Sequence, residues 1–177
     1  MPEKVQRYYL NIDGASRGNP GPASAAMVVQ DESGAVLLTK SKTLGVTTNN
    51  VAEWSALEGA VKTLVYFAQR QGKIEAVIRS DSDLVVKQFN GRFKVRDPEL
   101  QLIAARVRNL LARQPNIDIK VIHIPREQNH LADKAANKAL DKMLGSNTLR
   151  GKGGIKDSPE KAGCRNRGEG NGSPFTE

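Results

Sequence analysis

The chain has 177 residues, 38% of them hydrophobic, which suits a single domain with a sizeable core. It has one cysteine and no long apolar run, so we expect neither disulfides, nor a membrane span, nor a secretion signal, but a reducing, cytoplasmic setting. The formal net charge of +8 favours a polyanionic partner, nucleic acid first, although a generic solvated surface carries the same charge.

Hydrophobic periodicity and turn residues divide most of the chain into strands and helices. The turn 31–34 joins the second strand to the third, and Gly72 ends a long helical pattern. In chain order we predict strands at 5–12, 23–30 and 35–44, a helix up to residue 71, a strand at 73–80, a helix from 81–83 to 90–91, a helix from 98, a strand at 117–124 and a helix from about 129 to 144.

This order, β-β-β-α-β-α-α-β-α, predicts an α/β fold with a mixed five-stranded sheet and helices on both faces. We assign it to a domain of residues 1–144. Beyond it only Ile155 and Phe175 are large and apolar. Such a segment buries too little surface to offset its ordering entropy, so residues 145–177 are predicted to form a disordered polar tail. The tail is either a solvated appendage or a weak nonspecific contact for nucleic acid.

The segment 12–23 contains the first functional signal. One acid, Asp13, ends the first predicted strand, and a run rich in glycine and proline leads into the second strand. A turn-capping role explains Asp13 taken alone. The glycines indicate in addition that another part of the chain approaches the backbone closely beside this carboxylate.

Four acids lie where strands end or helices begin: Asp13, Glu53, Asp81 and Asp133. Strand ends and helix starts of an open α/β sheet meet at one edge, where ligands bind. Four carboxylates gathered there repel one another, so cations must compensate them or their pKa values must rise. Two hard divalent ions with oxygen ligands are the simplest solution. Taken singly, helix-dipole and N-cap roles explain Glu53, Asp81 and Asp133 as well.

The segments around these acids closely resemble the four motifs of type 1 ribonuclease H, in the same order and spacing, over roughly residues 5–142. The matching segments are 13–23, 48–53, 80–85 and 129–133. The resemblance implies the ribonuclease H fold and an endoribonuclease that cuts the RNA strand of RNA–DNA hybrids. It also implies two magnesium ions, with manganese as an alternative, and products with 5′-phosphate and 3′-hydroxyl ends. The implied partner is the hybrid duplex, and we expect a monomer.

The resemblance implies that all four acids are catalytic metal ligands. Asp13 would bridge both ions, and Glu53 and Asp81 would join it around the ion on the leaving side. Asp133 would serve the ion that activates water.

The implied substrate contacts lie beside the first two motifs: Gly14, Ser16, Asn19, Thr48, Asn49 and Asn50. Amide side chains suit the minor groove because they both donate to and accept from base edges and 2′-hydroxyls. Asn50 is in addition well placed to cap the long helix, and the two roles are compatible.

The sequence departs from the best-known bacterial pattern at residues 90–98. Many relatives carry an extra basic helix there that grips the hybrid, whereas this chain keeps only three basic residues around Phe93. Phe93 either packs against the domain or stacks on a base. The chain therefore resembles a compact branch of the family, and its affinity for the hybrid is expected to be lower.

A second departure is the short loop 124–129, where relatives have a longer loop with a catalytic histidine. We interpret His123 and His130 as structural. We assign part of the missing role to Arg126, because a guanidinium cannot act as a base but can bind a phosphate oxygen with two donors. A simple surface pair with Glu127 is the alternative for Arg126.

Two other functions are compatible with this fold. A nucleic-acid-binding domain without cleavage is disfavoured, since clustered acids beside phosphates weaken binding. A nuclease for another duplex, such as double-stranded RNA, is the second alternative.

Overall fold

A mixed five-stranded sheet forms the centre of the molecule in the computed structural model, which describes the backbone of residues 5–150 and the side chains of residues 5–146. The strand order is β3-β2-β1-β4-β5. Neighbours β1, β2 and β3 are antiparallel, and β4 and β5 continue the sheet in parallel with β1. The strands are β1 (Gln6–Ser16), β2 (Gly21–Gln30), β3 (Val36–Thr47), β4 (Ile74–Ser80) and β5 (Ile117–His123).

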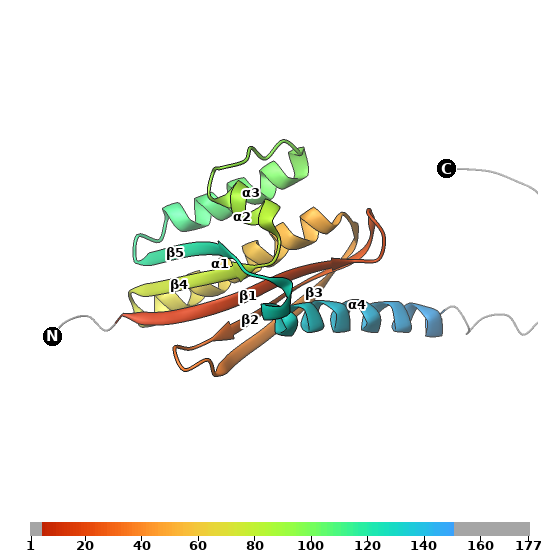
Figure 1. The fold of residues 1–177 in the computed structure, drawn as a ribbon, viewed down its shortest axis with the longest axis horizontal. Helices are drawn as coiled ribbons and strands as arrows, with labels where there is room; N and C mark the ends of the chain where they lie inside the picture. Colours follow the sequence, from red (N-terminus) through yellow and green to blue (C-terminus); the bar gives the residue numbers. More distant parts are fainter. Residues whose placement is uncertain (1–4, 151–177) are drawn as a thin grey trace, which may run out of the picture.

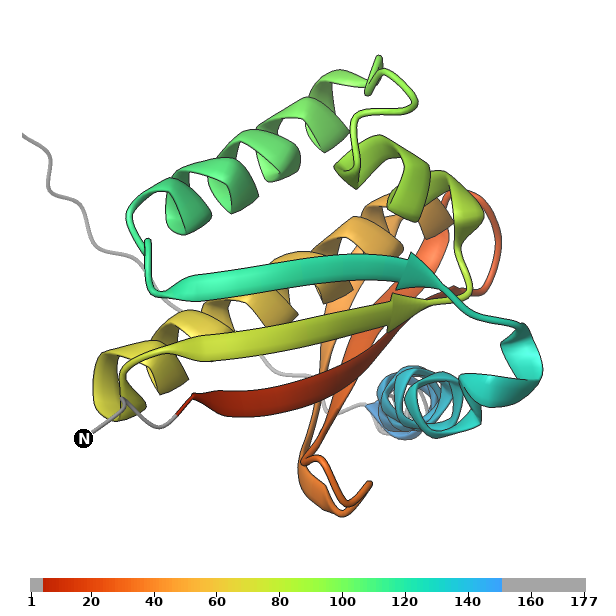
Figure 2. The same ribbon diagram turned by 60° about the vertical axis from the view of Figure 1, so that its left-hand side comes forward.

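Helices cover both faces of this sheet, as Figures 1 and 2 show. Helix α1 packs on β1 and β2 and in turn against α3, whereas α4 packs on the other face of β1, β2 and β3. A large apolar core lies on the α1 side, and a small cluster with Ala136 and Leu140 lies under α4. The helices are α1 (Asn49–Gln71), α2 (Asp83–Phe89), α3 (Pro98–Ala112), the single 3-10 turn η1 (Arg126–Gln128) and α4 (His130–Arg150).

The predicted fold class is confirmed, and the turn 31–34 forms as expected. The Asp31 carboxylate accepts hydrogen bonds from the backbone N–H groups of Ser33 and Ala35 at 2.9 and 3.0 Å. Side chains of this kind stabilise tight turns by replacing backbone partners. Across residues 5–150, none of the helices has both the length and the apolar character that crossing a bilayer requires.

The capping roles considered as alternatives for Asn50 and Asp81 belong to neighbouring residues. Thr48, not Asn50, caps α1, because its backbone is extended and its hydroxyl accepts from the Val51 N–H at 3.3 Å. Ser82, not Asp81, caps α2 in the same way. The side chains of Asn50 and Asp81 therefore remain available for other contacts.

Two predicted boundaries also shift. Strand β1 continues to Ser16, so Asp13 lies inside the strand opposite Ala26 rather than at its end. Helix α4 continues six residues beyond the predicted end at Leu144, to Arg150. One glycine inside a helix costs only about 1 kcal/mol, which neighbouring residues offset. The remaining residues of the predicted disordered tail, 151–177, lie outside the described part of the chain.

Candidate active site

Three of the four predicted acids meet at one edge of the sheet. Asp13 comes from β1, Asp81 follows β4, and Glu53 lies in the second turn of α1. Because β1 and β4 are parallel and pair Ile12 with Ser80, the residues that follow these two positions emerge side by side. One carboxylate oxygen from each of the three acids lies within 4.8 Å of the others.

Gly14 explains how α1 comes so close to β1. A Cβ atom at Gly14 would lie 2.3 Å from the backbone nitrogen of Glu53, which is far shorter than any real contact. Only glycine fits at this position, since it has no side chain to displace the helix. Gly14 therefore holds Glu53 beside Asp13, a packing role distinct from the substrate contact that the resemblance implies.

Burial makes the charged forms of the carboxylates in this cluster energetically unfavourable. Asp13 and Glu53 are each only 5% exposed. Loss of solvent, followed by repulsion from Asp81 and Asp133, raises the pKa of Asp13 from 3.8 to about 7. Loss of solvent and repulsion from Asp13 and Asp81 likewise raise the pKa of Glu53 well above 4.5.

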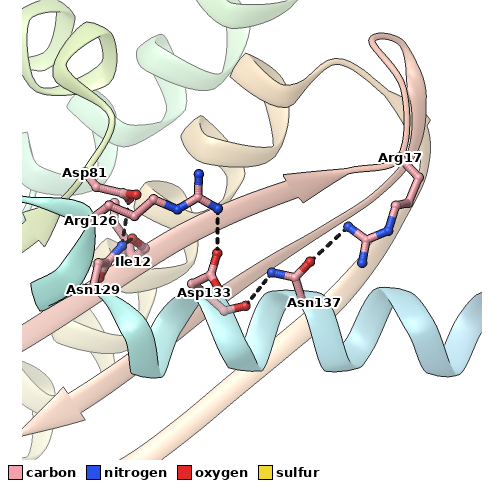
Figure 3. Close-up of polar contacts among 7 residues, drawn as sticks. All are labelled: Ile12, Arg17, Asp81, Arg126, Asn129, Asp133 and Asn137. Carbon is pink, nitrogen blue, oxygen red and sulfur yellow. Dashed lines mark hydrogen bonds and ion pairs between the residues drawn. The ribbon is translucent and has the colours of Figure 1, made fainter.

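The fourth acid, Asp133, lies in the first turn of α4 at the exposed side of the cluster. It is outside the group of three, yet its charge contributes to the raised pKa of Asp13. Its Oδ1 atom forms an ion pair with Nη2 of Arg126 at 3.2 Å, which Figure 3 shows. The ion pair of Arg126 is thus with Asp133 and not with Glu127, the surface partner that was the alternative for this residue.

The predicted substrate residues lie around the same edge of the sheet. Ser16 ends β1, Asn19 lies in the following turn, and Thr48, Asn49 and Asn50 form the start of α1. The side-chain oxygen of Asn19 accepts from the backbone N–H of Asn49 at 3.2 Å, which joins the first two motifs. All five are at least partly exposed to solvent.

The histidines and Phe93 lie at the surface. His123 ends β5 and His130 begins α4, both with exposed side chains. Phe93 is 49% exposed, and the Lys87 ammonium lies 5.1 Å from the centre of its ring.

Sequence reasoning gave no role to Asn129, although the residue begins the fourth motif. The structure buries it completely, and its amide donates to the Ile12 carbonyl oxygen at 2.9 Å and to Asp81 Oδ1 at 2.8 Å. The only sequence signal was its position four residues before Asp133. That signal alone also describes an ordinary helix cap.

The cluster fits a hard divalent cation. Such ions prefer oxygen ligands, and the described residues supply three converging carboxylates with Asp133 nearby. Glu53 Oε2 is buried and has no hydrogen-bond partner among the described residues, so one oxygen is left for a ligand. Asp13, Glu53 and Asp81 would hold such a cation.

Comparisons with known proteins point to one family. A family described as "Reverse transcriptase-like" matches residues 11–139. Ribonuclease HI of Halobacterium salinarum is 39% identical over 141 residues, which cover 80% of this chain and 68% of that protein. A bifunctional protein of Mycobacterium tuberculosis is 38% identical over 133 residues, 75% of this chain, but the match spans only 35% of that longer protein.

Solved structures agree as well. LC11-RNase H1 in complex with an RNA/DNA hybrid, a protein isolated from compost by a metagenomic approach, has a TM-score of 0.72 and 40% identity, covering 77% of this chain and 99% of that one. RNase H1 of Halobacterium salinarum has a TM-score of 0.68 and 39% identity, covering 77% and 98%. Its fold, its carboxylate cluster and its similarity to these relatives show that the chain belongs to the type 1 ribonuclease H family and is a ribonuclease H.

Proposed function

We propose that the protein is an endoribonuclease that hydrolyses the RNA strand of RNA–DNA hybrids with two divalent cations and leaves 5′-phosphate and 3′-hydroxyl ends. The observation that carries the proposal is the convergence of Asp13, Glu53 and Asp81 within 4.8 Å, with Asp133 beside them. The LC11 relative, 40% identical, is known in complex with an RNA/DNA hybrid, which supports this substrate.

The chemistry is an in-line displacement in which a bond forms between a water oxygen and phosphorus and the bond from phosphorus to the 3′ oxygen breaks. Bound cations supply the charge that lowers the pKa of water and offsets the charge on the departing oxygen. The charges of Asp81 and Asp133 both raise the pKa of Asp13, and the charge of Asp13 raises the pKa of Glu53, so Asp13 is electrostatically coupled to each of the other three acids. We therefore assign Asp13 to both cations, with magnesium as the expected ion and manganese as the alternative.

Substrate recognition falls to the partly exposed residues at the start of α1 and in the turn after β1. Asn49 and Asn50 present amides that both donate and accept, which suits 2′-hydroxyls and base edges in the minor groove. Thr48 is assigned to a phosphate of the DNA strand, and Ser16 and Asn19, which are partly exposed, to substrate contacts near the first motif. Contacts of this kind read the sugar and the groove shape rather than base identity.

Arg126 is assigned the stabilisation of phosphate charge during attack. Its side chain is 77% exposed and pairs with Asp133 through one nitrogen. Its charge lowers the pKa of Asp13 and of Glu53, so it acts electrostatically on the two buried acids. A guanidinium so placed can hold a phosphate oxygen with two donors and exchange Asp133 for the substrate.

The test is incubation with end-labelled RNA–DNA hybrid, double-stranded RNA and double-stranded DNA, each with and without magnesium. The proposal expects internal cuts in the hybrid's RNA strand only, dependent on magnesium, with products that a 5′-phosphate-dependent exonuclease degrades. Binding without cleavage would support the non-catalytic alternative, and equal cleavage of double-stranded RNA would support the broader nuclease. Size-exclusion chromatography and cell fractionation test the monomeric state and the cytoplasmic location that we include in the proposal.

A further inference from the structure

Asn129 lies at a junction of three segments that carry the acids. Its side chain is 0% exposed. Its Nδ2 atom donates to the Ile12 carbonyl oxygen at 2.9 Å and to Asp81 Oδ1 at 2.8 Å, as Figure 3 shows. Its Oδ1 atom accepts from Nδ2 of Asn11 at 3.1 Å. Both donor hydrogens of the amide are therefore used, and one of its bonds ends on a carboxylate of the cluster.

The backbone of the same residue reaches the fourth acid. Asn129 immediately precedes α4, and its carbonyl oxygen accepts from the Asp133 N–H at 3.1 Å. An asparagine at this place normally turns its side chain to the first helical N–H groups. Here the amide is instead directed to β1 and Asp81. One residue thus contacts the strand next to Asp13, the side chain of Asp81 and the backbone of Asp133.

The rest of α4 is anchored independently of this junction. The Ser24 hydroxyl donates to the Ala136 carbonyl oxygen at 2.6 Å on the buried face. On the exposed face Arg17 donates to Asn137 at 2.9 Å, and Asn137 donates to the Asp133 carbonyl oxygen at 2.9 Å (Figure 3). Arg17 also donates to Asp141 at 3.0 Å. Loss of the Asn129 side chain should therefore leave the helix docked and disturb the acids locally.

We propose that Asn129 is a positioning residue that holds Asp81 and the start of α4 in register with Asp13, and so sets the carboxylate geometry that binds divalent cations. This inference rests on the proposed cation-dependent function. Hydrogen bonds to ligating carboxylates commonly tune metal affinity about 10- to 100-fold, because they restrict the ligand to one orientation. Asn129 supplies such a bond from a fully buried side chain to the partly exposed carboxylate of Asp81.

The experiment is calorimetric titration of Mn²⁺ alone into the full chain, with thermal unfolding recorded for each variant. Asn129→Ala should bind Mn²⁺ about 10- to 100-fold more weakly than the wild type. Asn116→Ala is the matched control, since its amide also donates to backbone carbonyl oxygens, of Gly72 at 2.9 Å and Ala68 at 3.4 Å, at the opposite edge of the sheet. It should lower the melting temperature similarly and leave Mn²⁺ affinity unchanged.

Asn11→Ala provides a second variant that touches no acid. Asn11 donates to the Asn129 Oδ1 atom at 3.1 Å and to the Gln128 carbonyl oxygen at 3.2 Å, so its removal acts on the acids through the segment that holds Asn129. We expect a smaller loss than for Asn129→Ala, and this variant decides the question if Asn129→Ala does not fold. If Asn129→Ala and Asn11→Ala both fold and bind Mn²⁺ as tightly as the wild type, the inference is overturned and the proposed function stands. If the wild type binds no Mn²⁺, or binds it equally well after Asp13→Asn, the proposed function is overturned, and the inference with it.

Discussion

The two halves of the acid site differ in how firmly the fold holds them. Asp13 and Glu53 are 5% exposed and lie on a central strand and the central helix. Asp133 and Arg126 have side chains that are 33% and 77% exposed and lie at the start of the outer helix and in a 3-10 turn. The buried half concentrates unfavourable charge that cannot move away, whereas the exposed half consists of an ion pair that can change partners.

This difference suggests a division of labour. A buried, repelling group of carboxylates remains stable in the charged form only with cations, so it is suited to binding them. A solvent-exposed ion pair is worth little energetically, about 0–1 kcal/mol, so its partners separate readily when a phosphate arrives. Mutations in the two halves should therefore have different consequences for turnover and for stability.

The largest expected effect comes from Asp13→Asn in the buried half. Turnover on the hybrid should fall by at least about 10³-fold, since the residue placed to serve both cations loses its charge. The melting temperature without metal should rise, because a repelling charge is removed from the cluster. Single-turnover cleavage and metal-free thermal unfolding measure the two effects. Near wild-type turnover would refute the assigned site.

Arg126→Ala tests the exposed half. Turnover should fall by roughly one to two orders of magnitude, as expected for one lost charge-stabilising donor. The melting temperature should change little, because the pair with Asp133 is exposed. Steady-state kinetics with the hybrid decide the point. A fully active Arg126→Ala together with an inactive His130→Ala would transfer the role to the histidine.

The stability of the metal-free protein should decrease between about pH 4 and pH 7. The folded state raises the pKa of Asp13 from 3.8 to about 7, so the folded protein binds a proton that the unfolded chain has released in this range. The contribution of Asp13 is complete below pH 3.8, is lost as the pH rises through about 7, and amounts to at most about 4 kcal/mol.

Urea unfolding in a chelator at pH 5 and pH 8 measures this dependence. Asp13→Asn is the control, because the difference between it and the wild type isolates Asp13, and the repulsion it exerts on Glu53, from the histidines and the distant acids. The stability of the wild type should fall more steeply with pH than that of the variant. Parallel profiles would show that Asp13 does not titrate in this range.

The smallest expected effect comes from Asn49→Ala at the rim of the site. Hybrid binding or turnover should weaken several-fold, in line with losing one or two hydrogen bonds of about 1 kcal/mol each. No base preference should emerge, because the contact is assigned to the sugar and the groove shape. Cleavage of hybrids with different sequences checks this. A strong new preference in the variant would argue against the assigned contact.

The element order and the gathering of the acids could be predicted because both follow from local signals. Hydrophobic periodicity and turn residues define the helices and strands. The ends of parallel strands meet at one edge of the sheet, which brings Asp13 and Asp81 together. Caps were harder, since several polar residues compete at each helix start and only the backbone geometry chooses Thr48 over Asn50. Helix α4 passes Gly145 because the whole helix, not one residue, decides its length.

The tertiary contacts of polar side chains could not be predicted at all. Nothing local distinguishes Asn129 as a buried junction from Asn129 as a cap, since its partners Asn11, Ile12 and Asp81 are distant in sequence. Arg126 had an acid as its immediate neighbour, yet it pairs with one seven residues away. Such choices depend on which segments the sheet brings together.

The most direct test of the account is anomalous X-ray scattering from Mn²⁺ in crystals of the protein with a hybrid whose RNA strand resists cleavage. The account predicts two peaks about 3.5–4 Å apart, as in other two-metal sites. One peak should lie among Asp13, Glu53 and Asp81, and the second between Asp13 and Asp133. A single peak, or peaks away from Asp13, would contradict the central claim that the buried and exposed halves of the site share their cations through this residue.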